Sequence, residues 1–169
     1  MKKIQVIVDG KRQDIVIEED TLKALLLNNP LVKNGYERVG NMMEYYAMRL
    51  SGDICDMTES NDLVDKQAYE SGNYYSNLKV AKNNARADKL MRQLRRFAVE
   101  NCKEVPWDNN AEHWYIRSEI VNKSLFADVV TYAKDFGGIY FDTQENTEKA
   151  IELFKNELMW YFTEYKDRL

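Results

Sequence analysis

The sequence predicts an α+β fold, because strand-like and helix-like patterns occupy separate segments of the chain. Residues 3–18 alternate apolar and polar side chains, residues 77–102 repeat apolar side chains at helical spacing, and residues 113–165 read as strands followed by a helix. Hydrophobic residues make up 44% of the 169 residues and charged residues 31%, which is a globular composition. The chain is long enough to bury a core of its own.

The N-terminal segment is expected to form a ββα element. The alternation in residues 3–18 is interrupted by Asp9-Gly10, which predicts a hairpin with a four-residue loop. Residues 21–29 predict a short helix that Pro30 ends. The apolar residues expected on one face of the hairpin are Ile4, Val6, Ile15 and Ile17.

The middle of the chain predicts short extended pieces and one short helix. Residues 36–39, 43–50 and 54–60 are rich in strand-forming side chains around a Ser51-Gly52 turn, which indicates a small antiparallel meander. Residues 62–70 then predict a helix that ends before Gly72.

The longest predicted helix spans residues 77–102, after Ser76 as its N-cap, because no Gly or Pro interrupts it. At 100° per residue its two faces differ sharply. The apolar face carries Val80, Ala87, Leu90, Met91, Leu94 and Phe97. The basic face carries Lys82, Arg86, Lys89, Arg92 and Arg96.

The last third predicts a βββα unit, with strands in residues 113–121, 124–132 and 137–142 and a helix from Thr143 to about residue 165. Residues 105–110 should end the long helix and act as a hinge. We therefore expect two parts, residues 1–104 and 105–169, packed as one compact unit. The sequence shows no exact internal repeat.

Charge and composition exclude several classes of protein. A net charge of −4 argues against indiscriminate nucleic-acid binding, so any such contact must be local. The N-terminal apolar run stops at Asp9, too early for a signal peptide or a membrane span, and a cytoplasmic protein is expected. Cys55 and Cys102 form no CxxC pair and His113 is the single histidine, so no metal or other cofactor is expected. We expect the thiols to be small buried side chains and His113 to lie at the surface or on an edge strand.

Two charge blocks are the candidate binding sites. Residues 76–103 carry eight Lys or Arg and two Asp or Glu, whereas residues 51–75 carry six acids and one lysine. The basic face could contact nucleic-acid phosphates or an acidic groove of a protein, or could be an ordinary solvated helix face. The acidic segment could mimic nucleic-acid phosphates, could bind a cation, or could face the basic helix of the same chain. The five candidate carboxylates among its six acids are Asp53, Asp56, Glu59, Asp62 and Asp65.

Aromatic residues provide a third set of candidates, and catalysis has little support. Trp107 and Trp114 could stack on bases, and Trp160 and Tyr161 belong to an aromatic run that cannot face one core entirely, so at least one of its rings should be exposed. The sequence contains no GxSxG, Walker-type, GxGxxG or HExxH motif. Carboxylates distant in sequence can still meet in space, which leaves a metal-dependent nuclease as a third-ranked reading.

Several longer segments carry a family resemblance. They are GYERVG with EYY, SGNYYS, NARADKLMRQLRRFAVEN and FGGIYFDTQENTEKAIELFKNELMWYFTEY. Together they resemble a group of small proteins encoded by phages and prophages of gut Firmicutes, over most of the chain from Tyr36 onward. The resemblance implies a bacterial host cell and a genetic context that also supplies type II anti-CRISPR proteins. It transfers no catalytic residue.

The sequence therefore favours a binding protein over an enzyme. The leading hypothesis is a phage-derived, stoichiometric inhibitor of a host defence nuclease, specifically an anti-CRISPR protein that binds Cas9, with or without its guide RNA or DNA. The alternative is a nucleic-acid-binding accessory or regulatory phage protein that uses the basic helix 77–102 directly.

Overall fold

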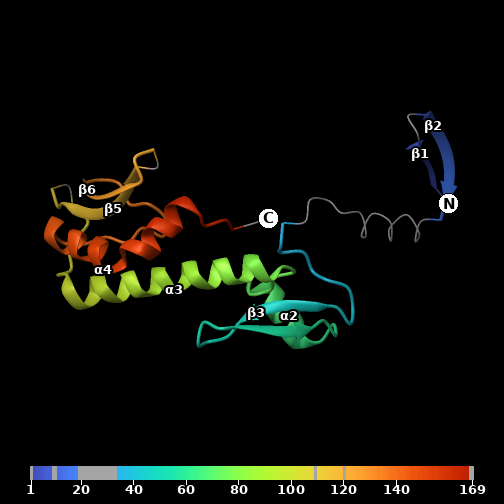
Figure 1. Cartoon of the computed structure of the whole chain (residues 1–169), viewed down its shortest axis with the longest axis horizontal. Coiled ribbons are helices and arrows are strands. Elements are labelled where there is room, and N and C mark those ends of the chain that lie inside the picture. The colour runs from blue at the N-terminus through green and yellow to red at the C-terminus, as the bar shows by residue number, and fades with distance from the viewer. Residues whose placement is uncertain (1, 9–10, 19–33, 109, 120, 168–169) are drawn as a thin grey trace. The chain divides into compact units, whose positions relative to one another are not determined.

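The computed structural model describes residues 2–8, 11–18, 34–108, 110–119 and 121–167. Three helices and three two-stranded antiparallel sheets occur in this part of the chain, which confirms the α+β class (Figure 1). The chain divides into two compact units, Met1–Lys33 and Asn34–Leu169. The boundary expected near residue 104 therefore lies inside the second unit.

The first unit contains the predicted hairpin. Strand β1 (Lys2–Val8) pairs antiparallel with β2 (Lys11–Ile17), and Ile4 lies opposite Ile15. Val8 pairs directly with Lys11, so two residues separate the strands and the expected four-residue loop is wrong. The helix expected at residues 21–29 lies outside the described residues.

The second unit begins with a hairpin and a short helix. Strands β3 (Glu44–Met48) and β4 (Ile54–Thr58) pair antiparallel around Gly52, whose φ of 91° favours glycine. Residues 36–39 form no strand, so the expected meander is a hairpin. Helix α2 (Leu63–Glu70) confirms the prediction and starts at a capping box formed by Asp62 and Asp65.

Helix α3 (Leu78–Asn101) is the long predicted helix. Its N-cap is Asn77 instead of Ser76, because the Asn77 side chain accepts hydrogen bonds from the backbone N–H groups of Lys79 and Val80. The apolar face is confirmed, with Val80, Ala87, Leu90 and Leu94 buried and Met91 and Phe97 half-buried.

The C-terminal part is a ββα arrangement. Strand β5 (His113–Glu119) pairs with β6 (Ser124–Val130), and α4 (Gln144–Thr163) starts at the predicted N-cap Thr143. The third strand expected at residues 137–142 is wrong. Gly137, with a φ of 76°, and Gly138 form a turn there, and only Phe141 reaches β5, through an isolated bridge to Trp114.

Two copies of one arrangement follow each other in the second unit. The first module, residues 35–101, and the second module, residues 103–163, each contain a hairpin, an isolated bridge and a long helix. In the first module Tyr46 bridges to Tyr75, two residues before the N-cap of α3. In the second module the Trp114–Phe141 bridge lies two residues before the N-cap of α4. The repeat is structural, since the sequence gives no exact copy.

The core joins the two modules along their helices. Each long helix covers one face of its own hairpin, and α3 and α4 pack on each other (Figure 1). Leu90 and Leu94 of α3 cluster with Ala150 and Leu158 of α4. In the first module, α2 covers the opposite face of the β3–β4 hairpin, where Ala68 packs on the cluster around Tyr45 and Tyr74.

Substitution of Gly35 tests how closely the backbone packs on Val80 at the start of the first module. A Cβ atom added there would lie 2.6 Å from Val80 Cγ2, and its φ of 95° disfavours side chains. We expect Gly35→Ala to lower the free energy of unfolding by about 3 kcal/mol in urea titrations, from strain and overpacking together. Gly72 has a φ of 75° and no atom within 4 Å of an added Cβ, so Gly72→Ala is the matched control, with a cost of about 1 kcal/mol. Equal costs would show that the contact with Val80 is not close.

Candidate functional site

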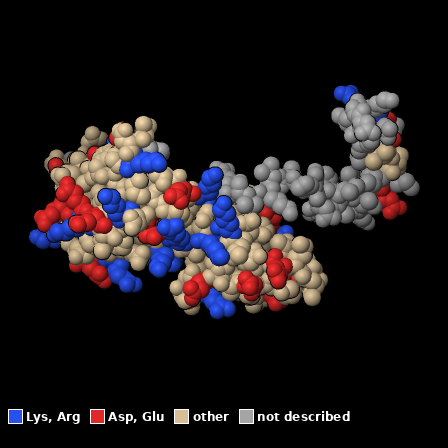
Figure 2. All heavy atoms as spheres, in the orientation of Figure 1, with Lys and Arg blue, Asp and Glu red and all other residues tan. Residues whose placement is uncertain are grey.

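The basic face of α3 is the most exposed concentration of charge in the second unit. Figure 2 shows Lys and Arg side chains gathered along this helix. The five basic residues predicted for this face are all exposed. Among the described residues, no carboxylate forms an ion pair with Lys82, Lys89, Arg92 or Arg96. These four cations are therefore available to an external anion, while the Arg86 hydrogen bond and, to a smaller extent, the charge of Lys89 lower the pKa of Glu157 on α4.

Arg86 differs from its neighbours on this face. Its guanidinium donates to both oxygens of Glu157 on α4, at 2.7 and 3.1 Å, and lies 4.0 Å from the centre of the Trp160 ring. Bidentate pairing and stacking fix the planar guanidinium in one orientation. Arg86 therefore links α3 to α4, and the free basic face consists of the other four residues.

Only part of the acidic segment is exposed, which corrects the prediction that all five of its candidate carboxylates form a binding surface. Glu59 is 1% exposed. Its carboxylate accepts hydrogen bonds from the Arg38 guanidinium at 2.9 and 3.0 Å and from the Tyr74 hydroxyl at 2.8 Å. The Arg38 pairing keeps the pKa of Glu59 below its ordinary value.

Asp65 is buried in the same region, with an exposure of 2%. It accepts hydrogen bonds from the Ser60 backbone N–H at 2.7 Å and from the Tyr45 hydroxyl at 2.9 Å. These donors, the Ser60 N–H first, lower the pKa of Asp65 to about 2. Burial, with the bond to Glu59, raises the pKa of Tyr74 to about 12. Glu59 and Asp65 therefore hold the first module together and cannot present charge to a partner.

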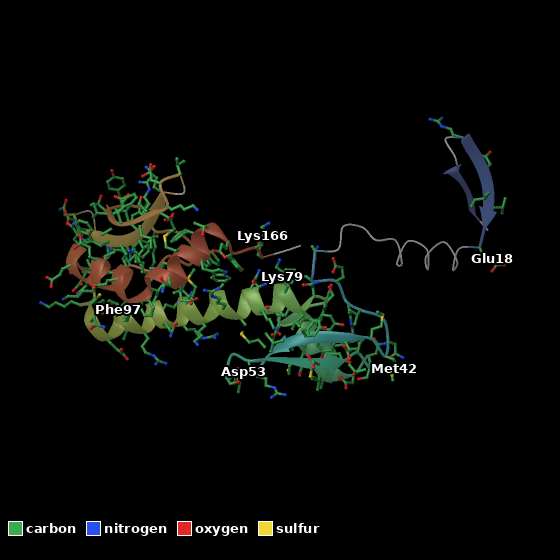
Figure 3. All side chains as sticks on the ribbon, viewed as in Figure 1. Glu18, Met42, Asp53, Lys79, Phe97 and Lys166 are labelled. Atoms are coloured by element: carbon green, nitrogen blue, oxygen red, sulfur yellow. The ribbon has the colours of Figure 1, made fainter. Side chains whose placement is uncertain are left out.

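Three of the five candidate carboxylates of the segment remain exposed. Asp62 caps α2, and Asp53 accepts a hydrogen bond from Ser51 at the β3–β4 turn (Figure 3). Asp56 lies on β4. The basic helix passes this turn, since an added Cβ at Gly52 would lie 3.8 Å from the Arg92 guanidinium. The phosphate-mimicking surface expected from five carboxylates is thus reduced to three.

The four aromatic candidates do not form one interface. Trp107 is 40% exposed, Trp114 and Tyr161 are half-buried, and Trp160 is only 9% exposed beneath Arg86. Phe162 is also half-buried, so the exposed ring expected in the aromatic run is wrong. Trp114, Tyr161 and Phe162 pack in the core between α4 and the β5–β6 hairpin, and Trp160 packs against Arg86. Helical spacing alone did not reveal these contacts.

Of the two positions expected for His113, the edge strand is confirmed, since β5 belongs to a two-stranded sheet, and the surface is wrong. His113 is 2% exposed and lies face to face with Trp107, with ring centres 3.5 Å apart and an interplanar angle of 6°. The segment 105–110, expected to act as a hinge, thus packs on β5 of its own module through Trp107.

Cys55 and Cys102 are free thiols and half-buried.

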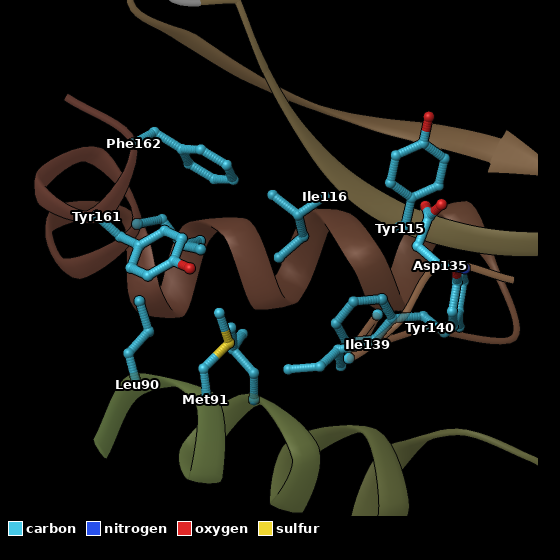
Figure 4. Close-up of a pocket in the computed structure, with 14 residues that line it drawn as sticks. Leu90, Met91, Tyr115, Ile116, Asp135, Ile139, Tyr140, Tyr161 and Phe162 are labelled. Carbon is cyan, nitrogen blue, oxygen red and sulfur yellow. The ribbon is translucent and has the colours of Figure 1, made fainter. Parts of the chain in front are cut away.

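An apolar pocket lies between α3, α4 and β5, and no sequence pattern indicated it. Its volume is about 210 Å³. Figure 4 shows its wall, which includes Leu90, Met91, Ile116, Ile139, Tyr161 and Phe162. Cavities of this size and lining accept a single aromatic or aliphatic group. A strand at residues 137–142 would leave no such pocket, whereas the chain turns at residues 135–138 and continues along the border of the pocket as an irregular segment.

Comparison with known proteins adds no assignment. No family model, no curated protein and no solved structure matches this chain. In the described part of the chain, no helix combines the length and apolarity that crossing a membrane requires.

The buried carboxylates predict an acid-sensitive stability. The folded-state pKa of Asp65, about 2, lies below its ordinary value of 3.8, so its ionised form stabilises the fold above about pH 4 and loses this effect as the pH falls toward 2. Asp65→Asn should lower the urea midpoint at pH 7, and the difference from wild type should shrink between pH 4 and pH 2. Asp56→Asn is the control, since Asp56 is exposed. A difference that stays constant with pH would contradict the assigned role of the Asp65 charge.

Proposed function

We propose that this chain is a phage-derived protein that inhibits a host defence nuclease by stoichiometric binding, and that the nuclease is Cas9. The observation that carries the proposal is the row of four exposed cations on α3 without ion pairs in the described residues. The family resemblance in the sequence supplies the phage context. In this proposal the basic face of α3 binds the guide RNA or DNA that is already bound to the target protein.

The geometry of α3 suits a charged strand. Lys82, Lys89 and Arg96 are spaced by seven residues, so they lie about 10 Å apart along one side of the helix. The helix has no Gly or Pro and is packed on both modules, which keeps the charges in a fixed row. A fixed row of cations attracts phosphates at long range and releases counterions when it binds.

The acidic segment supports the proposal less well. Two of its five carboxylates are buried, and a third, Asp62, caps α2. We therefore expect Asp53→Lys/Asp56→Lys to retain the inhibition of Cas9 cleavage, measured by titration at a fixed concentration of guide-loaded Cas9. Loss of inhibition in this variant, with the fold retained, would move the binding site to the acidic segment.

The direct test titrates the purified chain into a Cas9 DNA-cleavage reaction, before and after guide loading, with the guide checked on a gel. Inhibition should saturate near one chain per Cas9 and leave the guide intact. Lys89→Glu/Arg92→Glu/Arg96→Glu should weaken inhibition by about tenfold or more at 0.1 M salt, because like charges then oppose the phosphates. Arg49→Glu/Lys66→Glu/Lys123→Glu makes the same charge change at exposed positions outside α3 and should retain inhibition.

Other outcomes of this titration are equally informative. Inhibition at far lower ratios, with a shortened guide, would make the chain an enzyme that acts on the guide. The absence of inhibition at every ratio would remove Cas9 as the target. Equal losses in the two triple variants would show that net charge matters and that the α3 face does not.

The same four cations favour a second candidate, a nucleic-acid-binding accessory protein of the phage. Four phosphate contacts predict a slope of about −3 to −4 in a plot of log affinity against log salt concentration. Fluorescence anisotropy with labelled RNA and DNA would measure this slope, and Lys89→Glu/Arg92→Glu/Arg96→Glu should flatten it. A flat salt response of the wild type would remove this candidate.

A further inference from the structure

The two modules differ in one element. In the first module α2 lies between β4 and the Tyr46–Tyr75 bridge and covers the face of the hairpin opposite α3. In the second module the corresponding segment, residues 131–138, forms no helix and no strand. We call the face of the β5–β6 hairpin opposite α4 the open face; among the described residues no helix covers it. It carries His113, Tyr115, Arg117, Phe126 and Asp128.

The open face lacks a hydrogen-bond acceptor that the first module has. By position relative to the bridges, His113 corresponds to Tyr45 and Tyr140 corresponds to Tyr74. The Tyr45 hydroxyl donates to Asp65 of α2 at 2.9 Å. The Nε2 atom of His113 is buried and has no hydrogen-bond partner in the part of the chain that the structure describes. An unpaired buried polar atom costs free energy, so a carboxylate supplied from outside would relieve the cost.

A groove beside His113 is shaped and charged for such a group. It encloses about 550 Å³ between the C-terminal end of α3 and the segment before α4. Lys103 and Lys134 line it, with Glu104 as its one acidic lining residue in the described chain. Lys134 Nζ lies 5.3 Å from the centre of the Trp107 ring. The groove therefore combines an apolar floor with a net positive rim.

Exposed apolar side chains extend this surface. Val99, at the C-terminal end of α3, is largely exposed and lines the groove. Tyr132 and Phe136, on the segment that takes the place of α2, are almost wholly exposed, and Lys134 and Gly138 of the same segment line the groove. Exposed apolar groups beside a polar rim are typical of protein-binding sites.

We propose that the open face binds a short helix of a partner protein, one with an apolar stripe and a carboxylate at the position that Asp65 holds in α2. The carboxylate accepts a hydrogen bond from His113 Nε2, and Lys134 attracts it by charge. The apolar stripe packs on Val99 and Phe136. The site and its occupant do not depend on whether Cas9 is the target of the α3 face.

The Trp107 ring controls the access of a carboxylate to His113 Nε2. Its ring covers one face of His113, and because Nε2 is buried the ring must move aside before a carboxylate can reach that atom. Trp107 belongs to a segment without helix or strand and is 40% exposed, so the movement breaks no secondary structure. The indole is therefore a reporter of binding at this face.

The test titrates the ¹⁵N-labelled full chain with a stapled helical peptide that has the sequence of residues 60–72, which contains α2. We expect saturable shifts of the Trp107 indole and of the His113 amide. The peptide with Asp65→Asn should bind about tenfold more weakly, the loss of one charge-assisted hydrogen bond. In the chain, Lys134→Glu should weaken binding by about fivefold or more, whereas Lys123→Glu, an exposed lysine on the β5–β6 turn, should change it by less than about twofold.

His113→Phe separates the hydrogen bond from the rest of the contact. Phe keeps a ring to stack on Trp107 and removes Nε2, so in this variant the preference for the Asp peptide should fall from about tenfold to about threefold or less, the part that remains coming from the charge of Lys134. A variant that still favours the Asp peptide by tenfold would overturn the role of His113.

Three results would overturn the proposal as a whole. The first is no shift at Trp107 or His113 at millimolar peptide. The second is movement of the same resonances when the chain alone is diluted, which would assign the face to a second copy of the chain. The third is shifts confined to the backbone amides of β6, which would indicate addition of an extended strand.

Discussion

The packing of α3 against α4 is the contact on which the second unit depends. Leu90 and Leu94 meet Ala150 and Leu158 there, while Val80 and Ala81 of the same helix face the first hairpin. One apolar face of α3 thus serves two modules along its length. Because that face is fully used inside the molecule, the opposite face must meet solvent, and it is the face that carries the cations. The position of the basic row is a consequence of the core.

The charged residues divide into two kinds by their surroundings. Arg38 and Arg86 have carboxylate partners and aromatic neighbours, and they connect elements of the fold. Lys82, Lys89, Arg92 and Arg96 have no ion pair in the described residues and stay in water. The first kind contributes through burial and geometry, and the second through a long-range field. Because some charged residues are paired inside the fold, the net charge counted over a segment of the sequence is larger than the charge which that segment exposes to a partner.

Comparison of the two modules explains why the open face of the second module differs from the corresponding face of the first. In the first module three layers, α2, the hairpin and α3, satisfy the buried polar groups, including Asp65 and Tyr45. In the second module Trp107 replaces part of the missing layer by stacking on His113, and Nε2 has no hydrogen-bond partner among the described residues. His113 Nε2 is thus a buried polar atom without a partner in that part of the chain, it lines the groove, and this combination separates the open face from the ordinary exposed surface of α4.

Local patterns in the chain are enough to predict the α+β class, the N-terminal and C-terminal hairpins, α2, the length of α3 and the composition of its two faces. These features depend on periodicity, caps and turns, which are contained in neighbouring residues. Long-range packing, in contrast, buries Glu59, Asp65 and His113, stacks Arg86 on Trp160, and places the turn at residues 135–138 beside a pocket. The partners of these residues lie far away in the chain, as with Arg38 and Glu59 or Arg86 and Glu157, and no local pattern records which distant group will meet a side chain.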